Sequence, residues 1–142
     1  MSKSDTFEND LLKLIFNATA IANLADNAAS SPLTSLYVAL HTSDPGEGGT
    51  QATNEATYTS YARVAVVRTS SGWTVSGSSV TPVSQISFPA ATGGTNTITH
   101  FSIGVASSGA SKILYSGTVT PNISVSSGVT PILATASSVT ED

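Results

Sequence analysis

The side chains best suited to chemistry in this sequence are His41, Asp44 and Glu47, which lie close together along the chain. An imidazole beside two carboxylates can act in general acid–base catalysis or offer nitrogen and oxygen ligands to a metal. Their spacing matches neither a zinc motif nor the calcium loop of an EF-hand. The two carboxylates share one loop, and no sequence feature places His100 near them. We therefore expect no catalytic site, no metal and no cofactor here.

Other catalytic and binding motifs do not match the sequence. Cysteine is absent, which excludes thiolate chemistry, disulfides and Cys-based metal sites. The many serines lack the Gly-Xaa-Ser-Xaa-Gly turn that opens a helix after a strand. Gly46, Gly48 and Gly49 are not followed by the Lys-Ser/Thr of a phosphate loop. We interpret these glycines as turn residues and expect that the protein is not an enzyme.

Charge and hydropathy limit the expected partners. The chain has nine acidic and five basic residues, a formal net charge of −4, whereas nucleic-acid binding needs clustered Lys and Arg. Arg63 and Arg68 lie close together, and we expect both on a sheet surface. Neither a membrane span nor a secretory signal is recognisable, so we expect no membrane partner. Only 10% of residues are charged, which favours a surface that is partly hidden in an assembly or inert outside cells.

The first part of the chain is expected to form a helix. From about Phe7 to Leu24, apolar residues recur at spacings of three and four, the helical period. Thr6 or Asp5 is the expected N-cap. The apolar stripe is wide enough to be covered on more than one side. The helix therefore either meets another chain or packs across its own sheet, and the segment from Asp26 to Pro32 links it to the first strand.

The stretch after this link is expected to run from a strand into a turn and a loop. Leu36 to Leu40 is apolar-dense and is typical of a core strand. Asp44-Pro45-Gly46 supplies turn residues. Glu47 to Ser60 has no apolar period, so we expect an exposed arm. Tyr58 and Tyr61 near its end either contact a partner or anchor the arm to its own sheet.

The remainder of the sequence predicts strands separated by turns. Thr69-Ser70-Ser71-Gly72 is expected to join the strand before it to one that begins at Trp73, as a hairpin. Trp73 itself is expected to pack in the core or at its rim. Including the first, the predicted strands are Leu36–Leu40, Tyr61–Thr69, the run from Trp73 to Val75, Val83–Phe88, Thr97–Val105, Lys112–Thr120, Ile123–Ser126 and Pro131–Ala136.

About eight short strands after one helix indicate a mainly β fold. The pattern is typical of a β-sandwich or jelly roll with one N-terminal α-helix. A chain of 142 residues fits a single domain. Within this domain, residues 1–32 are the helix and link and residues 33–142 are the β domain.

Seven stretches spread over most of the chain have a recognisable sequence: Leu36–Gln51, Tyr58–Val66, Gly72–Val75, Ile86–Ala90, Thr99–Gly104, Leu114–Gly117 and Val139–Asp142. Together with the N-terminal helix, they resemble a family of small virion proteins of tailed bacteriophages, often labelled tail-fibre or unassigned structural proteins. The resemblance implies a component of the virion that is assembled in the host cytoplasm. It brings no catalytic residues, and it leaves the position on the head or the tail open.

We therefore expect a structural virion protein, first of all an oligomeric capsid decoration or cement protein that stabilises the head. Its expected partners are copies of itself, with a trimer as one option, and other virion proteins such as the major capsid protein. A tail-fibre or baseplate-associated module is the alternative, and a carbohydrate-binding module that stacks sugars on Trp73 and nearby tyrosines ranks below it. The expected assembly contacts are Phe7, Leu11, Leu14, Ile15, Ile21, Asp44, Glu47, Tyr58 and Tyr61.

Overall fold

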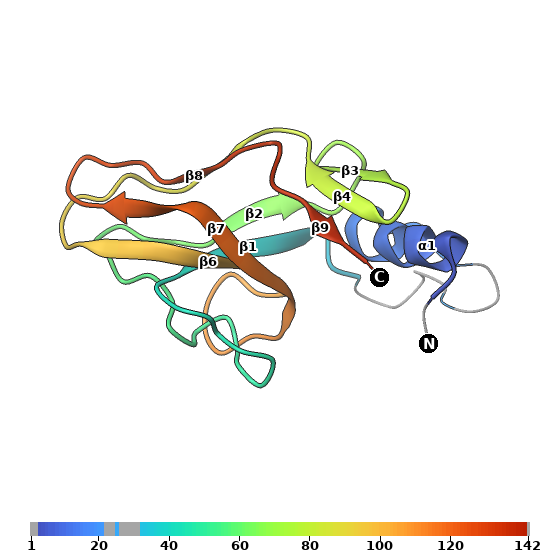
Figure 1. Cartoon of the computed structure of the whole chain (residues 1–142), viewed down its shortest axis with the longest axis horizontal. Coiled ribbons are helices and arrows are strands. Elements are labelled where there is room, and N and C mark those ends of the chain that lie inside the picture. Colours follow the sequence, from blue (N-terminus) through green and yellow to red (C-terminus); the bar gives the residue numbers. More distant parts are fainter. Residues whose placement is uncertain (1–2, 22–24, 26–31, 142) are drawn as a thin grey trace. The chain divides into compact units, whose positions relative to one another are not determined.

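The computed structural model describes residues 3–21, 25 and 32–141, so most of the predicted link from Asp26 to Pro32 lies outside the described residues. The described part contains one helix and nine strands, which confirms the mainly β fold with an N-terminal helix (Figure 1). The elements are α1 (Asp5–Asn17), β1 (Ser35–His41), β2 (Val64–Val67), β3 (Trp73–Ser76), β4 (Ser79–Pro82), β5 (Ile86–Ser87), β6 (Asn96–Gly104), β7 (Ile113–Val125), β8 (Ile132–Leu133) and β9 (Val139–Thr140). They form three sheets, with strand orders β2-β1-β6-β7, β3-β4-β9 and β5-β8.

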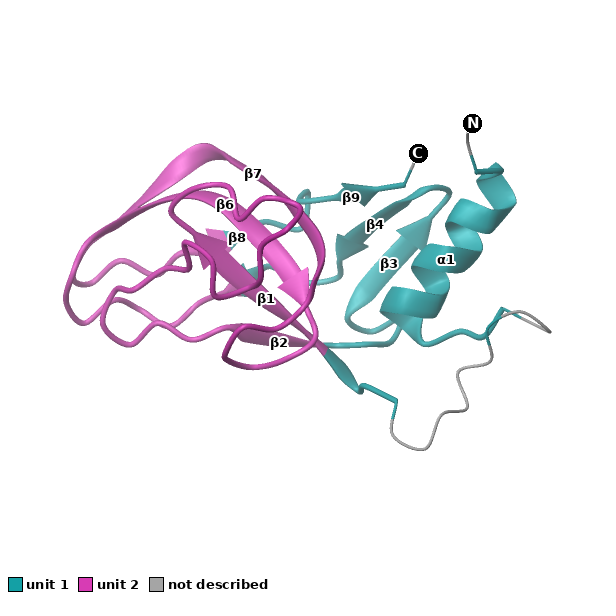
Figure 2. Cartoon of the chain, turned by 90° about the horizontal axis from the view of Figure 1, so that it is seen from below, with its two compact units in different colours: residues 1–35, 67–86, 133–142 teal, residues 36–66, 87–132 magenta. Residues whose placement is uncertain are grey.

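The chain divides into two compact units, which Figure 2 colours separately. Unit 1 comprises residues 1–35, 67–86 and 133–142, and unit 2 comprises residues 36–66 and 87–132. Unit 1 contains α1 and the β3-β4-β9 sheet, whereas most of the four-stranded sheet belongs to unit 2. The single domain expected from the length of the chain stays a prediction.

Helix α1 starts with a different N-cap from the two residues predicted. The side-chain oxygen of Ser4 accepts a hydrogen bond from the backbone N–H of Phe7 at 3.4 Å. Thr6 and Asp5 are therefore not the cap, because the chain already turns into the helix at Asp5. Asp5 and Glu8 place negative charge in the first turn, where it interacts favourably with the positive end of the helix dipole.

The helix ends at Asn17, so the predicted continuation towards Leu24 is wrong. Ala18 has a φ of 53°, the left-handed conformation that commonly ends helices, and its backbone N–H bonds to the carbonyl of Lys13. Asn17, the last residue of the helix, and Thr19, which comes directly after Ala18, also have low helix propensity. The apolar spacing continues past this point in the sequence, but the backbone does not follow it.

Unit 1 covers α1 with its own sheet, which is one of the two packings considered above. Leu12 and Phe16 are fully buried, and α1 lies against β3 and β4. The ring of Phe16 meets the ring of Trp73 edge to face, with 4.9 Å between the centroids. The side-chain amide of Asn9 donates to the carbonyl of Gly77 at 2.7 Å, which ties the helix to the β3–β4 turn. Trp73 therefore packs in the core, as expected.

The hairpin that contains Trp73 differs from the predicted one. β3 pairs antiparallel with β4, so that Trp73 lies opposite Pro82, and Gly77 in the turn between them has a φ of 58°. Thr69–Gly72 forms a turn, with the N–H of Gly72 bonded to the carbonyl of Thr69. However, β2, which precedes this turn, belongs to another sheet. The predicted hairpin is therefore wrong, because the strand after the turn finds its partner further along the chain.

Arg68 supplies the positive charge that the last turn of α1 lacks. Its guanidinium donates to the backbone carbonyls of Leu14, Ile15 and Leu33. The last carbonyls of a helix have no partner inside the helix, and the dipole is negative there. Arg68 therefore caps the C-terminal end of α1 from a distant position in the sequence.

β1 is an inner strand of the four-stranded sheet, and it covers the predicted Leu36–Leu40 strand with one more residue at each end. Residues 38–41 are buried without alternation, so side chains on both faces of this strand are covered. β6 pairs with it antiparallel, with Tyr37 opposite Gly104 and His41 opposite His100. The two histidines of the chain are therefore neighbours across two strands.

β7 joins two of the predicted strands, Lys112–Thr120 and Ile123–Ser126, into one strand of 13 residues. Pro121, which lies between the two predicted strands, falls where the register against β6 shifts between Ile98 and His100. An irregular position in a ladder does not need the N–H that proline lacks. The prediction of two strands is therefore wrong, because the irregularity accommodates the proline.

Residues 42–63, which we call the covering segment, fold back onto β1 in unit 2. Gln51 is fully buried, and Ala56 is 5% exposed. The backbone N–H of Ala56 donates to the carbonyl of Leu40 at 2.8 Å. The arm predicted as exposed over Glu47–Ser60 is therefore only partly exposed: Gln51, Ala56 and Tyr58 are buried, whereas both ends of the segment are exposed. The prediction is wrong for its middle, because residues there find partners inside the unit.

Candidate functional site

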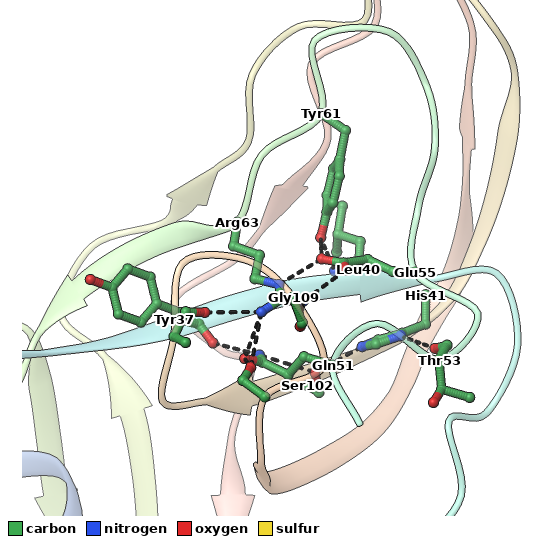
Figure 3. Close-up of polar contacts among 12 residues, drawn as sticks. Tyr37, Leu40, His41, Gln51, Thr53, Glu55, Tyr61, Arg63, Ser102 and Gly109 are labelled. Atoms are coloured by element: carbon green, nitrogen blue, oxygen red, sulfur yellow. Dashed lines mark hydrogen bonds and ion pairs between the residues drawn. The ribbon is translucent and has the colours of Figure 1, made fainter. Parts of the chain in front are cut away.

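The densest polar cluster of unit 2 is a buried network centred on Arg63 (Figure 3). Arg63 is 8% exposed. Its Nε donates to Oε1 of Glu55 at 2.7 Å and its Nη2 donates to Oε2 at 2.8 Å, which makes a two-pronged ion pair. Further bonds reach the carbonyls of Ala106 (3.0 Å) and Gly109 (2.7 Å) and the hydroxyl of Ser111 (3.0 Å). The predicted position of Arg63 on a sheet surface is therefore wrong. Its guanidinium N–H groups donate hydrogen bonds that link the covering segment to the β6–β7 loop.

The carboxylate of Glu55 is engaged on both oxygens. Besides Arg63, it accepts a hydrogen bond from the hydroxyl of Tyr61 at 3.0 Å, and that hydroxyl accepts one from the backbone N–H of Leu40 at 3.0 Å. The hydrogen bond with Glu55 raises the pKa of Arg63, and burial raises the pKa of Tyr61. Arg63 therefore stays protonated and Tyr61 stays neutral. Both oxygens of the Glu55 carboxylate are taken up by hydrogen bonds from these two side chains, so the three residues form a structural link within unit 2.

Gln51 fills the space above β6 and joins three parts of unit 2. Its Nε2 donates to the carbonyl of Tyr37 at 2.9 Å, and its Oε1 accepts from the hydroxyl of Ser111 at 2.8 Å. Gly104 leaves room for this side chain, because a Cβ at that position would lie 2.2 Å from Cδ of Gln51. The amide therefore packs directly on the backbone of β6.

His41 continues the network on the other side of Gln51. Its Nδ1 lies 2.8 Å from the carbonyl of Thr53, and its Nε2 lies 2.8 Å from the hydroxyl of Ser102. A carbonyl can only accept, so the proton of the neutral ring is on Nδ1, and Nε2 accepts from Ser102. The amide nitrogen of Gln51 is 3.4 Å from the same hydroxyl. Hydrogen bonds therefore run in one direction from Gln51 through Ser102 and His41 to Thr53.

We expect mild acid to destabilise the protein through His41. Burial lowers the pKa of its imidazole below the ordinary value of 6.5. The unfolded chain then takes up the proton first, so the free energy of unfolding falls as the pH drops below about 6.5, by at most about 1.4 kcal/mol per pH unit for one group. Urea unfolding of the protein and of His41→Gln on either side of that pH measures the difference. Equal pH dependence in both proteins would contradict this role, because the two share every carboxylate.

The residues predicted to do chemistry do not form one site. His41 is buried, and Asp44 and Glu47 are exposed. His41 forms an antiparallel bridge with Glu55, yet the carboxylate of Glu55 is bonded to Arg63. Across the residues that the structure describes, no three His, Asp or Glu side chains gather closely enough to bind a metal ion.

The two tyrosines near the end of the covering segment anchor it to unit 2. Tyr58 is 2% exposed, and its hydroxyl donates to the carbonyl of Pro89 at 2.9 Å. Its ring meets that of Tyr61 edge to face at 5.3 Å, and Tyr61 stacks on Phe88 at 6.4 Å. Of the two roles considered for these tyrosines, the described chain shows the anchoring one.

The apolar residues predicted as assembly contacts differ in exposure. Phe7 is 38% exposed, whereas Leu11, Leu14 and Ile15 are half-buried on α1. Ile21 lies beyond the helix and pairs with Ala25 in an isolated bridge, so it is not part of a helical stripe. A contact of these residues with another chain stays a prediction.

Several residues of the network had no signal in the sequence. Gln51, Ser102 and Ser111 stand among many polar residues, and polarity alone favours a loop or a solvent-facing position. Arg63 alternates with apolar residues, which is the pattern of an edge or a wet face. These four residues are buried or half-buried because their hydrogen-bond partners come from distant parts of the chain. A local sequence pattern cannot predict such partners.

Comparison with known families gives one match that covers nearly the whole chain. A family model described as "Podophage GP4 fiber I protein gp80" matches residues 2–140. A search of curated proteins found no match. Within the described residues, helix α1 is too short and too polar to cross a bilayer.

Proposed function

The chain belongs to the family described as Podophage GP4 fiber I protein gp80, and we propose from this premise that it is a fibre component of a phage virion. The family match over residues 2–140 is the observation that carries the proposal. As a member of this family, the chain is a phage structural protein. Its finer role, as a module that builds or attaches a fibre, is the tail-fibre alternative considered from the sequence.

The buried network supports a structural role. Arg63 and Glu55 are the only oppositely charged pair in it; they are bonded to each other, and Arg63 also donates to the loop carbonyls of Ala106 and Gly109. His41 and Gln51 hold the same segments from the other side. These four side chains therefore hold the covering segment and the β6–β7 loop on one sheet, which suits a protein that must keep its shape in a particle.

The two other roles considered have less support. The family description names a fibre, so the capsid decoration role stays a prediction that no comparison supports. The carbohydrate-binding role relied on Trp73 as a platform for a sugar ring. Trp73 is 2% exposed and packs against Phe16, so its face is occupied within the protein.

The proposed partners are copies of the chain and other virion proteins. Their support is physical: the low share of charged residues suits close packing against other proteins. Large apolar side chains also remain exposed on the described surface, namely Phe7, Leu33, Val67, Val83 and Ile132. Such side chains are common singly on protein surfaces, so they add support without defining an interface.

Immunogold labelling of intact virions tests the proposed location. Antibodies raised against the purified protein should place gold on fibres that project from the particle. Virions of a phage deleted for the gene are the control and should lose both the label and the fibre density. Gold spread over the head surface, with the fibres unlabelled, would contradict the proposal and would support the capsid decoration role instead.

A further inference from the structure

A short turn of the covering segment lies over a histidine that is closed off from water. His41, at the end of β1, is fully buried. Residues 50–54, which we call the lid, form a turn in which the N–H of Thr53 bonds to the carbonyl of Thr50. The carbonyl of Thr53 lies 2.8 Å from Nδ1 of the imidazole, so the lid contacts the ring directly (Figure 3).

The hydrogen bonds around His41 fit only its neutral ring. Nδ1 donates to the lid, and Nε2 accepts from the hydroxyl of Ser102. A proton on Nε2 would turn this nitrogen into a donor, and the amide of Gln51 already approaches the same hydroxyl as a donor at 3.4 Å. In the described part of the chain, the side chain of Ser102 has no further hydrogen bond, so its own proton would be left buried without an acceptor.

The charges around His41 do not offset a positive ring. The ionisable side chains on the neighbouring segments are Asp44, Glu47, Glu55 and Arg63 in the covering segment, His100 on β6 and Lys112 before β7, and β7 itself contains none of Asp, Glu, Lys, Arg or His. The carboxylate of Glu55 is already bonded to Arg63. Burial is the main cause of the low pKa of His41, and the charges of Arg63 and His100 lower it further, against the opposing effects of Glu55 and of the backbone bond.

The rest of the covering segment is held by groups that keep their protonation in mild acid. Arg63 stays charged and Tyr61 stays neutral, because their pKa values are raised. The lid itself is joined to the β6–β7 loop by the N–H of Gln51, which donates to the carbonyl of Ser111 at 3.0 Å. Opening of one short turn costs less free energy than unfolding of the whole protein. The imidazole can therefore reach water through movement of the lid alone.

We propose that the lid is operated by acid: it stays closed over β1 and β6 while His41 is neutral, and it opens when the ring takes up a proton on Nε2. In the open state water hydrates the charged imidazole, which removes the penalty for a buried charge. Opening also uncovers Ser102 and the backbone of Gly104, on which Gln51 packs. This switch goes beyond the proposed function, because it depends on His41 and not on where the protein lies in the virion.

Amide hydrogen exchange followed by NMR at pH 7.5 and pH 5.5 tests the lid, after correction for the intrinsic pH dependence of exchange. The amides of Gln51 and Thr53 report lid opening, since both are bonded in the closed state. Their opening should increase in acid, by up to about tenfold at pH 5.5 for a histidine that titrates normally once exposed. The amides of Phe88 and Ala91, which bond to the carbonyls of residues 131 and 129 in the same unit, should keep their protection.

Two variants assign the response to one ring. His41→Gln should abolish it, because the amide can donate to Thr53 and accept from Ser102 but does not titrate. His100→Gln is the matched control and should keep it. The chain has only two histidines, so a response in this pH range that survives in His100→Gln is assigned to His41 even if His41→Gln does not fold.

Three results would overturn the switch. The first is a change of less than about twofold at Gln51 and Thr53 in the natural protein, where tenfold is expected for one titrating group. The second is an equal loss of protection at Phe88 and Ala91, which would show general unfolding. The third is a response that persists in His41→Gln or disappears in His100→Gln. Immunogold labelling of fibres does not depend on any of these results, so the proposed function is judged separately.

Discussion

Replacing Arg63 with alanine should lower the free energy of unfolding by about 3–5 kcal/mol, the usual cost of removing one partner of a buried ion pair. The change leaves the carboxylate of Glu55 without its two-pronged partner. It also removes the donors for the carbonyls of Ala106 and Gly109 and for the hydroxyl of Ser111. Urea unfolding followed by circular dichroism measures the loss.

The control for Arg63 is the other ion pair that the described residues show. Nζ of Lys3 lies 3.1 Å from Oε2 of Glu141; the Lys3 side chain is 33% exposed and that of Glu141 13%, whereas the Arg63 side chain is 1% exposed. Lys3→Ala should therefore cost less than Arg63→Ala, because the ammonium group is much closer to water than the guanidinium. If Arg63→Ala cost no more than Lys3→Ala, the network would not hold the covering segment. Glu55→Gln with Arg63→Met shows whether the pair itself stabilises, since a neutral pair leaves no buried charge.

Gly104→Ala should destabilise the protein by at least about 2 kcal/mol through overpacking. The new Cβ would lie 2.2 Å from Cδ of Gln51 and 2.6 Å from the backbone oxygen of Lys112. The side chain of Gln51 can move only by giving up its bonds to Tyr37 and Ser111. The backbone oxygen is the second obstacle, because the β6–β7 loop must shift to clear it. Thermal and urea unfolding measure the effect.

Gly48→Ala is the matched control, since a Cβ there meets nothing within 4 Å. Its effect should stay within about 0.5 kcal/mol, as for most surface changes. Adding Gln51→Ala to Gly104→Ala removes the first clash but not the second, so the double change should cost less than the sum of the two single changes. Strictly additive costs would show that Gly104 and Gln51 do not share the same space.

Elements with a strong local pattern could be predicted from the sequence. The Leu36–Leu40 strand and the Thr97–Val105 strand match β1 and β6 to within a residue or two at each end, because dense or alternating apolar residues report a buried strand directly. The start of α1 was predicted only approximately: the helix was expected from about Phe7 with Thr6 or Asp5 as its N-cap, but it begins at Asp5 with Ser4 as the cap, because several polar residues that can cap a helix precede the apolar period. The short strands were less accurate: Val83–Phe88 and Pro131–Ala136 reduce to β5 and β8, two residues each.

Pairing partners and buried polar residues could not be predicted in the same way. β4 and β9 consist of Ser, Val, Thr and Pro, and they pair with each other although the strands β5 to β8 lie between them in the sequence. Their strand conformation comes from tertiary hydrogen bonds rather than from a local period. The same reason applies to Gln51 and Arg63, whose partners come from β1, the β6–β7 loop and the covering segment. The candidate site was therefore the least predictable part of the molecule.

The capping of α1 by Arg68 also sets an order of events in folding. A helix of 13 residues is only marginally stable by itself in water. Its last carbonyls obtain their donor from Arg68 and its apolar face obtains cover from Trp73, both synthesised much later. β9, which completes the sheet beneath it, is made later still. During translation the helix therefore precedes the tertiary contacts that stabilise it, and unit 1, whose first residues are made earliest, is completed last.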